Sequence, residues 1–382
     1  MSQESWIACN SILDSLSFTS SSRFYSIEHL KELLQILGNP DTQLKIVHVG
    51  GTNGKGSTTT FVAATCITAG YKTSHITSPH LSCVTERWLI DGSPVSREIF
   101  AKYILEVAHV AAVARIPLSY FELVTMASIY GAAKEGCEYL VLEVGLGGRL
   151  DSTNAISKAE VTAVTTIGYD HTDVLGNTLE EIAVEKFLIA KANTPLVLGR
   201  VAGQFAEIAR QQNIASAIEV AGKSFDFYSK LQALGFLGYQ LQNAEVAYRI
   251  LEILGFSEVE ISKGLKSALW PGRAEAFTDA SGRKWFFDGA HNQEGIVALE
   301  ETLVAYIKSN GIKSVCFMLS MLDRKPWNEL LGFWQKIFER LENLRVPVQP
   351  IADNFHFAVV TPDSDRRRND AHNVYRRSES GV

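Results

Sequence analysis

The sequence predicts an α/β protein in which a doubly wound, mostly parallel sheet carries a P-loop and precedes a smaller α/β C-terminal domain. Near-continuous apolar runs at 139–146, 161–167 and 194–199 are typical of strands buried on both faces. Helical spacing at about 96–114 and 121–135 places helices between such strands. Strands that alternate with helices of this length indicate a parallel sheet.

A break in this pattern predicts a second domain. The motif WPGR at 270–273 reads as a linker, and KWFFDGAHN begins a new strand-and-turn unit after it. CFMLSML supplies a further strand, and the last residues are polar and rich in arginine. We therefore divide the chain into domains at 1–269 and 270–360 and a solvated tail at 361–382.

Composition restricts the class of protein further. The 382 residues are 46% hydrophobic and 20% charged, which suits a soluble protein with two cores. A formal net charge of −6 argues against nucleic acid as the main ligand. The N-terminus lacks the pattern of a signal peptide, and no apolar run is long enough to span a membrane. Five scattered cysteines suit a reducing compartment, so we expect a cytoplasmic protein without disulfides or a cysteine zinc site.

The stretch HVGGTNGKGST at 48–58 is the strongest candidate site. Its glycines let backbone N–H groups approach phosphate oxygens, and the following helix points its positive end at the same place. Lys55 would supply a point charge, with Ser57 or Thr58 as the hydroxyl near a magnesium ion. Val49 replaces the first glycine of the usual P-loop, and Gly56 follows the lysine. The alternative is a flexible glycine turn, which this combination of residues disfavours.

LEVGLGGRLDSTN at 142–154 ends a buried strand with Glu143. An unpaired carboxylate there would be costly, so we expect it to meet a cation. The G-x-G at 145–147 is not a dinucleotide fingerprint, because Leu150 stands where the third glycine is needed. A dehydrogenase is therefore disfavoured.

Other candidates follow neighbouring strands. In GYDHTDVLG at 168–176, Asp170 and His171 lie at the carboxyl end of a strand, where open α/β sheets bind ligands. The D-x-x-G in the same stretch would suit a GTPase, but the chain has no N-K-x-D motif. Ser78 in TSPHL could give a metal hydroxyl. Phe121 in SYFEL offers either a stacking surface or a buried helix start.

Taken in order, these motifs resemble the folylpolyglutamate synthase/dihydrofolate synthase family, a branch of the Mur ligase superfamily. The resemblance covers about residues 20–325 and includes Val49 and Gly56, the departures from the usual P-loop. Its motifs are GTNGKGS (51–57), TSPHL (77–81), LEVGLGGRLDSTN (142–154), DH (170–171), EIAVEK (181–186), QLQNA (240–244), WPGR (270–273) and DGAHN (288–292).

The resemblance implies an ATP-dependent, ADP-forming amide ligase. It would add L-glutamate to dihydropteroate, to (tetrahydro)folate or to both, through an acyl phosphate, and release ADP and phosphate. Residues 1–269 would be the ATP-binding domain and 270–360 the glutamate ligase domain. The cofactors implied are ATP, Mg²⁺, a carbamylated Lys186 and a monovalent cation, and we expect a monomer.

The resemblance also assigns residues to roles. The catalytic residues would be Lys55, Lys186 and His171, and magnesium would bind Ser78, Glu143 and His171. The pterin would contact Phe121, Glu122 and Asp151. The nucleotide would contact the remaining set: Thr52, Asn53, Gly54, Lys55, Gly56, Ser57, Asn243, Arg273 and Asp288.

Two departures and two alternatives stay open. Gln293 stands where the family has proline, and beyond about residue 345 we find no counterpart of the family's final strands, so we expect an incomplete second domain. One alternative is a Mur-type ligase of cell-wall precursors, which GKGS in place of GKT disfavours. The other is a nucleotide-binding protein that has lost ligase activity.

Overall fold

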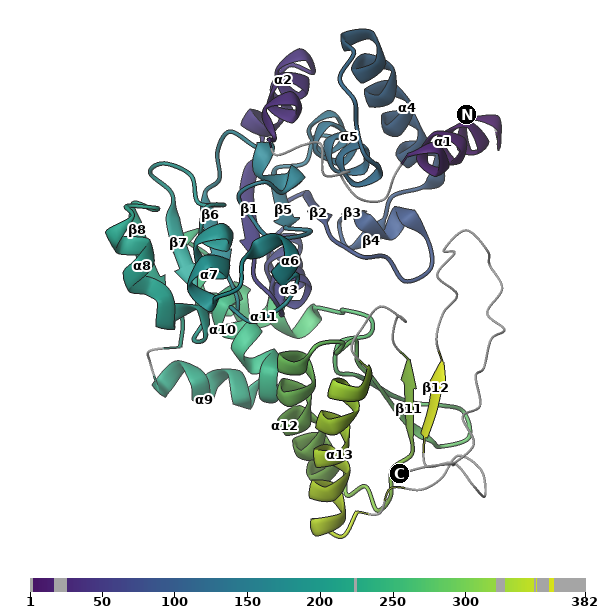
Figure 1. The fold of residues 1–382 in the computed structure, drawn as a ribbon, viewed down its shortest axis with the longest axis vertical. Helices are drawn as coiled ribbons and strands as arrows, with labels where there is room; N and C mark the ends of the chain where they lie inside the picture. Colours follow the sequence, from purple (N-terminus) through teal and green to yellow (C-terminus); the bar gives the residue numbers. More distant parts are fainter. Residues whose placement is uncertain are drawn as a thin grey trace. The chain divides into compact units, whose positions relative to one another are not determined.

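The computed structural model describes residues 3–16, 26–222, 225–320, 327–346, 348 and 357–360. The chain divides into two compact units (Figure 1). Unit 1 comprises 1–236 and 240–271, and unit 2 comprises 237–239 and 272–382. The tail predicted from residue 361 lies outside the described residues.

Unit 1 is built on one eight-stranded sheet, and this confirms the predicted fold class. The strand order is β4-β3-β2-β5-β1-β6-β7-β8. All neighbours from β2 through β8 pair in parallel, and β3 and β4 continue the sheet in antiparallel fashion. The strands are β1 (Lys45–Gly50), β2 (Thr73–Ile76), β3 (Trp88–Ile90), β4 (Ser93–Pro94), β5 (Tyr139–Glu143), β6 (Val161–Val164), β7 (Pro195–Leu198) and β8 (Ala217–Val220).

Helices cover both faces of this sheet, as the apolar runs predicted. On β1, Ile46 packs with the helices of one face, and its neighbour Val47 packs with those of the other. Because successive side chains of a strand point to opposite faces, each central strand needs apolar residues throughout. The first face is covered by α1 (Gln3–Ser15), α2 (Glu28–Ile36), α4 (Arg97–Ala114), α5 (Tyr120–Lys134), α7 (Leu179–Phe187) and α8 (Ala206–Gln211); the second by α3 (Lys55–Thr68), α9 (Phe225–Ala233), α10 (Gly238–Ile253) and α11 (Glu258–Ser267).

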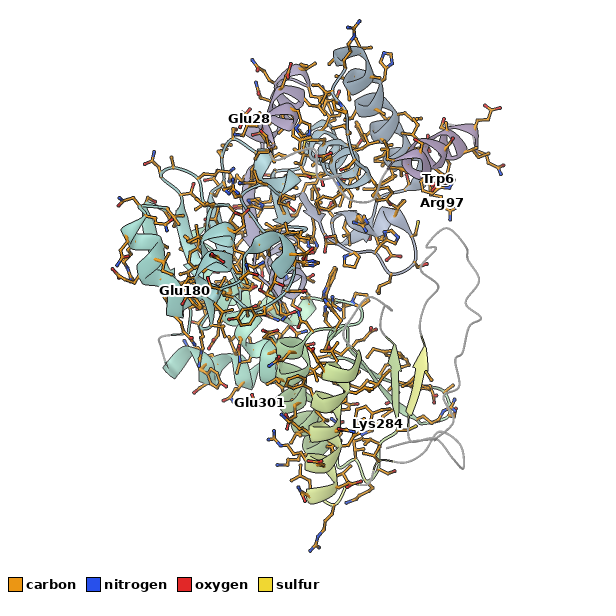
Figure 2. The ribbon with its side chains drawn as sticks, viewed as in Figure 1. Trp6, Glu28, Arg97, Glu180, Lys284 and Glu301 are labelled. Carbon is orange, nitrogen blue, oxygen red and sulfur yellow. The ribbon has the colours of Figure 1, made fainter. Side chains whose placement is uncertain are left out.

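Short elements complete unit 1. The helix α6 (Thr172–Leu175) precedes α7, and in the described part of unit 1 four 3₁₀ turns join longer elements. At the outer edge, α1 packs on α4, where the Arg97 guanidinium carbon lies 5.2 Å from the centre of the Trp6 ring (Figure 2). The 3₁₀ turns are η1 (Pro40–Gln43), η2 (Val84–Arg87), η3 (Ser152–Ala155) and η4 (Ala202–Phe205).

Unit 2 has its own apolar core. An antiparallel pair, β9 (Glu275–Thr278) and β10 (Lys284–Phe287), precedes α12 (Gln293–Ser309), β11 (Phe317–Ser320) and α13 (Trp327–Asn343). The helices α12 and α13 bury Leu303, Trp334 and their neighbours. The strands β10 and β11 lie where the sequence predicted them.

One strand of unit 2 was not predicted. We expected no further strand beyond about residue 345, and this is wrong for β12 (Phe357–Val360), which pairs in parallel with β11. The strand was missed because its four apolar residues are too few to form a recognisable periodic pattern within a largely polar segment.

No helix in the described part of the chain is both long enough and apolar enough to cross a membrane.

The central strands should dominate the stability of unit 1. Leu142 on β5 is fully buried, so Leu142→Ala should lower the free energy of unfolding by about 2–5 kcal/mol, through lost burial and the cavity left behind. Leu269→Ala makes the same change at a side chain that is 87% exposed and should cost under about 0.5 kcal/mol. Denaturant unfolding measures both, and equal losses would contradict the assigned core.

Candidate active site

Three strand ends meet at one edge of the unit 1 sheet. β1 pairs with β5 on one side and with β6 on the other, both in parallel. Val49 aligns with Glu143, and Gly50 aligns with Val164. The loops that follow these strands carry the glycine-rich motif, the motif LEVGLGGRLDSTN and the DH motif, so the sheet brings all of them to its carboxyl edge.

Backbone and hydroxyl hydrogen bonds fix the conformation of the glycine-rich loop between β1 and α3. The Asn53 N–H donates to Thr166 Oγ1 at 2.9 Å, and Thr165 Oγ1 donates to the Asn53 carbonyl at 2.6 Å. The Thr52 hydroxyl exchanges hydrogen bonds with the backbone of Gly168. The predicted nucleotide residues Thr52 and Asn53 are thus held in place by residues 165–168, which follow β6. The spacing of the sequence does not reveal these contacts.

Lys55 is the first residue of α3, and its ammonium group turns back over the loop. Nζ donates to the carbonyl oxygens of Gly51 at 2.9 Å and Thr52 at 3.2 Å. Ser57, in the same first turn, is buried. A loop of backbone N–H groups, a lysine and the start of a helix is the donor set that suits a nucleotide phosphate.

Gly54 is required by its backbone and by its neighbour. Its φ is +89°, a conformation that L-residues rarely adopt. A Cβ atom there would lie 2.2 Å from Oδ1 of Asn243, the buried α10 residue predicted to contact the nucleotide. The backbone carbonyl of Asn243 also accepts from Thr58 Oγ1 at 3.4 Å. The structure therefore brings Asn243 against the loop.

Gly56, the departure from the usual P-loop, has a packing reason. A Cβ atom at Gly56 would lie 2.8 Å from Cζ2 of Trp270, so the indole ring lies directly against the first turn of α3. Trp270 belongs to the WPGR motif, for which the sequence analysis predicted a linker and a nucleotide contact at Arg273 but no role for the tryptophan. Its Nε1 is buried and has no hydrogen-bond partner in the described part of the structure.

Two of the three predicted metal ligands are joined by a hydrogen bond. Glu143 ends β5 and is buried, and its Oε2 accepts from the Ser78 N–H at 3.0 Å and from the Thr77 hydroxyl. His171 adopts a left-handed backbone conformation after β6, with Nε2 3.9 Å from Asp170 Oδ1. Thr77 was missed from the sequence, although it lies beside Ser78 in the motif TSPHL.

The donor set at Glu143 fits magnesium better than a transition metal. The described residues contain no group of three or more histidine, cysteine, aspartate or glutamate side chains arranged for a metal. Mg²⁺ prefers oxygen ligands and is usually bound by one or two carboxylates, with water and substrate phosphates completing the shell. Glu143 is one buried carboxylate of this kind, and the backbone N–H of Ser78 lies beside it.

Lys186, on α7, is buried at the same edge. Burial, and then the positive charge of Lys55, lower the pKa of its ammonium to about 7, against the opposing effect of Asp170, Asp151 and Glu185. A Cβ atom at Gly148 would lie 2.9 Å from the Lys186 Cα, so the glycine-rich part of LEVGLGGRLDSTN rests on this helix.

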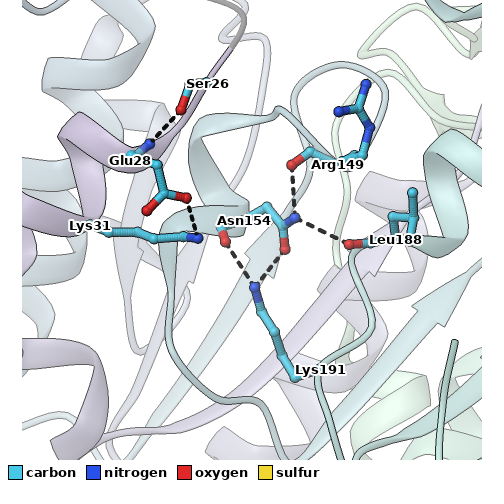
Figure 3. A network of polar contacts seen from close by, with 7 residues as sticks. All are labelled: Ser26, Glu28, Lys31, Arg149, Asn154, Leu188 and Lys191. Carbon is cyan, nitrogen blue, oxygen red and sulfur yellow. Dashed lines mark hydrogen bonds and ion pairs between the residues drawn. The ribbon is translucent and has the colours of Figure 1, made fainter.

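Asn154 ties that loop to the end of α7 (Figure 3). Its Nδ2 donates to the carbonyl oxygens of Arg149 at 3.0 Å and Leu188 at 3.2 Å. Lys191 Nζ in turn donates to Asn154 Oδ1 at 2.7 Å and to its backbone carbonyl at 2.8 Å. Leu188 lies two residues beyond Lys186, so this network, which sequence reasoning missed, fixes the helix that carries the buried lysine.

The predicted pterin residues have different surroundings. A Cβ atom at Gly145 would lie 2.4 Å from Cζ of Phe121, so the Phe121 ring lies against the loop after β5. Glu122 is buried; its Oε2 accepts from the Ser119 N–H at 2.7 Å in the capping box of α5, and its Oε1 lies 3.2 Å from His29 Nε2.

Asp151 holds the end of that loop. It accepts from the backbone N–H groups of Leu146 at 2.8 Å and Thr153 at 2.9 Å. Burial raises the pKa of the Asp151 carboxyl, and the hydrogen bonds from Thr153 and Leu146 oppose this rise.

Two predicted nucleotide residues belong to unit 2. Asp288 Oδ2 accepts from the Tyr239 hydroxyl and from the Ala274 N–H at 2.8 Å. Burial, and then the Asp288 carboxylate, raise the pKa of Tyr239, while the charge of Arg273 lowers it. Unit 2 thus gathers the linker arginine and the DGAHN aspartate. Gln293 is the first residue of α12, a position where proline and other residues are both accommodated.

Comparison with known proteins defines the class. A family model of the Mur ligase middle domain matches residues 49–224. Dihydrofolate synthase/folylpolyglutamate synthase of Bacillus subtilis is 32% identical over 362 residues, which cover 86% of this chain and 80% of that protein. The chain belongs to the dihydrofolate synthase/folylpolyglutamate synthase family, whose members are ATP-dependent, ADP-forming glutamate ligases.

Solved structures agree with this family. Folylpolyglutamate synthase of Mycobacterium tuberculosis complexed with ADP has a TM-score of 0.75 at 26% identity, over 88% of this chain and 80% of that chain. Escherichia coli FolC in complex with DHPP and ADP has a TM-score of 0.73 at 26% identity, over 87% of this chain and 81% of that one.

The contact between Gly54 and Asn243 predicts a specific defect. Gly54→Ala should weaken ADP binding at least tenfold, because the new Cβ displaces Asn243 and strains the loop. Gly70→Ala is a matched control: its φ is +94°, but a Cβ atom there would have no neighbour within 4 Å. In both variants the alanine must adopt a left-handed backbone conformation, which should lower the free energy of unfolding by about 1–2 kcal/mol. Thermal unfolding measures this loss. Equal ADP affinity in the two variants would contradict the role of this contact.

Proposed function

We propose that this chain joins L-glutamate to a reduced pteroate or folate, and that its active site is the carboxyl edge of the unit 1 sheet. The observation that supports this most is the meeting of a phosphate loop, a buried glutamate and a buried lysine of lowered pKa at that edge. ATP would transfer its γ-phosphoryl group to the substrate carboxylate, and the glutamate amine would then displace phosphate to form the amide.

In this proposal, Lys55 and the loop from Thr52 to Ser57 hold the nucleotide phosphates. The Lys55 ammonium exchanges its two backbone carbonyl contacts for phosphate oxygens, which are stronger, charged acceptors. Asn243 lines the same loop and would position the nucleotide. Arg273 and Asp288 stay predictions as nucleotide contacts.

Ser78, Glu143 and His171 would hold Mg²⁺. When bound there, the ion neutralises charge that develops on the transferred phosphoryl group. Glu143 is suited to this task because it is buried, and Thr77 and the Ser78 backbone fix one of its oxygens. The monovalent cation that the family resemblance implies stays a prediction.

Lys186 would act as a carbamate. Its neutral amine attacks CO₂, a nitrogen–carbon bond forms and one proton is released, so a cation becomes an anion. A pKa near 7 makes the neutral amine available under ordinary conditions. The change also replaces the repulsion between Lys186 and Lys55 by attraction.

Phe121 and Asp151 would bind the pteroate portion, the first by stacking and the second by hydrogen bonding. Glu122 would act mainly through the start of α5, since its carboxylate already caps that helix. We further propose a cytoplasmic monomer, in which the five free cysteines stay reduced.

A substrate panel tests this function. The purified chain, ATP and glutamate are combined with dihydropteroate, tetrahydrofolate or a muramoyl-peptide precursor, and ADP release and product mass are measured. We expect release that depends on both glutamate and a pteroate or folate. Lys55→Met should reduce turnover roughly 10²-fold or more. ADP binding without product from any acceptor would instead favour a nucleotide-binding protein, and product from the muramoyl substrate a cell-wall ligase.

Carbamylation of Lys186 predicts a dependence on CO₂. Removal of bicarbonate should lower activity, and activity should fall as pH drops through about 7, where the ammonium form of Lys186 prevails. Lys186→Ala should lose roughly 10²-fold in kcat and recover part of it with added formate. The exposed Lys158→Ala is the control and should retain full activity in each condition. A fully active Lys186→Ala would exclude the carbamate.

A further inference from the structure

His48 stands out in β1 because it is a polar side chain in a buried strand. It is fully buried, and it lies two residues before the glycine-rich loop. Its Nε2 lies 2.8 Å from the hydroxyl of Thr153, a residue 105 positions further along the chain. Its Nδ1 is buried and has no hydrogen-bond partner in the described part of the chain. An imidazole in such a position needs a reason, since unpaired buried polar atoms are costly.

The hydrogen bonds around Thr153 determine which nitrogen of His48 carries the proton. The Thr153 hydroxyl lies 2.5 Å from Asp151 Oδ1, which also accepts from the Thr153 N–H. A carboxylate only accepts, so the single hydroxyl proton of Thr153 points to Asp151. The hydroxyl oxygen must then accept from His48, and this requires a proton on Nε2 and a bare Nδ1.

The neutral form of the imidazole suits this arrangement. Burial, and then the charge of Lys191, hold the pKa of His48 well below its usual range. A neutral histidine protonated at Nε2 donates one hydrogen bond and places its unpartnered lone pair in the apolar interior. The chain of donors therefore runs in one direction, from His48 through Thr153 to Asp151.

We propose that His48 is a positioning residue that orients the Asp151 carboxylate through Thr153 and thereby couples the strand of the phosphate loop to the site of the pteroate portion. The inference rests on the proposed function of Asp151. Its basis is the geometry of the three side chains, which come from β1, from the η3 turn and from the residue that caps it. His48 touches neither substrate in this proposal and acts only through the hydroxyl of Thr153.

Steady-state kinetics with a double-mutant cycle test the proposal. His48→Met, which removes the donor, and Thr153→Val, which removes the hydroxyl, should each raise KM for dihydropteroate roughly tenfold, the effect of about one buried hydrogen bond. KM for ATP should stay within about twofold. Because both residues act through one chain, the double variant should be no worse than the worse single variant. Additive losses, or equal rises in both KM values, would overturn the proposal.

Two further variants separate positioning from general loss of stability. His48→Gln keeps an N–H donor at a similar reach and should restore most of the affinity for dihydropteroate. His75→Met is the matched control, since His75 is also buried and its Nε2 lies 2.9 Å from the hydroxyl of Thr59, which is no partner of Asp151. It should lose comparable thermal stability without raising KM for dihydropteroate. A rise equal to that of His48→Met would refute a specific role.

A measurement without turnover keeps the two proposals distinct. Nitrogen-15 NMR of the histidine-labelled chain, with the His48 signals assigned by their loss in His48→Gln, should show a protonated Nε2 and an unprotonated Nδ1. Thr153→Val should shift the Nε2 signal. If the wild-type chain forms no product, the proposed function fails, and the variants are compared by this spectrum and by direct binding of dihydropteroate. A proton on Nδ1 would overturn the inference even in an active enzyme.

Discussion

The parallel pairing of β1 between β5 and β6 is the constraint on which the rest of the site depends. A shift of one residue in this register would turn the strand side chains to the opposite face. Val49 would then no longer align with Glu143, and the buried carboxylate would leave the glycine-rich loop. The apolar residues on both faces of β1 oppose such a shift. The packing of the core therefore also fixes the distance between the glycine-rich loop and Glu143.

The electrostatics of this edge follow from that spacing. Without modification, Lys55 and Lys186 would place two like charges close together, and burial adds a penalty for the ammonium form of Lys186. Asp151, Asp170 and Glu185 favour the charged form of Lys186 and offset part of this effect. The phosphates of a bound nucleotide would add negative charge beside Lys55. The same residues that weaken one lysine as a base thus favour an anionic ligand.

Much of the fold could be predicted from the sequence, because strands buried on both faces and amphipathic helices leave periodic patterns. The glycine-rich loop and its family could be predicted as well, since they depend on contiguous residues. Contacts between distant segments could not. The packing of Trp270 on Gly56 and the hydrogen bond from His48 to Thr153 join residues more than 100 positions apart. His48 did leave a signal, as the one polar residue inside the apolar stretch IVHV. β12 left too short a pattern to recognise.

The contact of Trp270 with Gly56 limits where the C-terminal domain can be exchanged with that of a relative. Trp270 is among the last residues of unit 1, and the second unit resumes at residue 272. An exchange of C-terminal domains between relatives would therefore join safely only after the tryptophan. A junction placed before residue 270 would replace Trp270 by the corresponding residue of the relative. That side chain could then clash with α3 or leave a cavity beside it. A side chain larger than glycine at residue 56 would therefore need a smaller one at residue 270, although the first belongs to the nucleotide motif and the second to the linker.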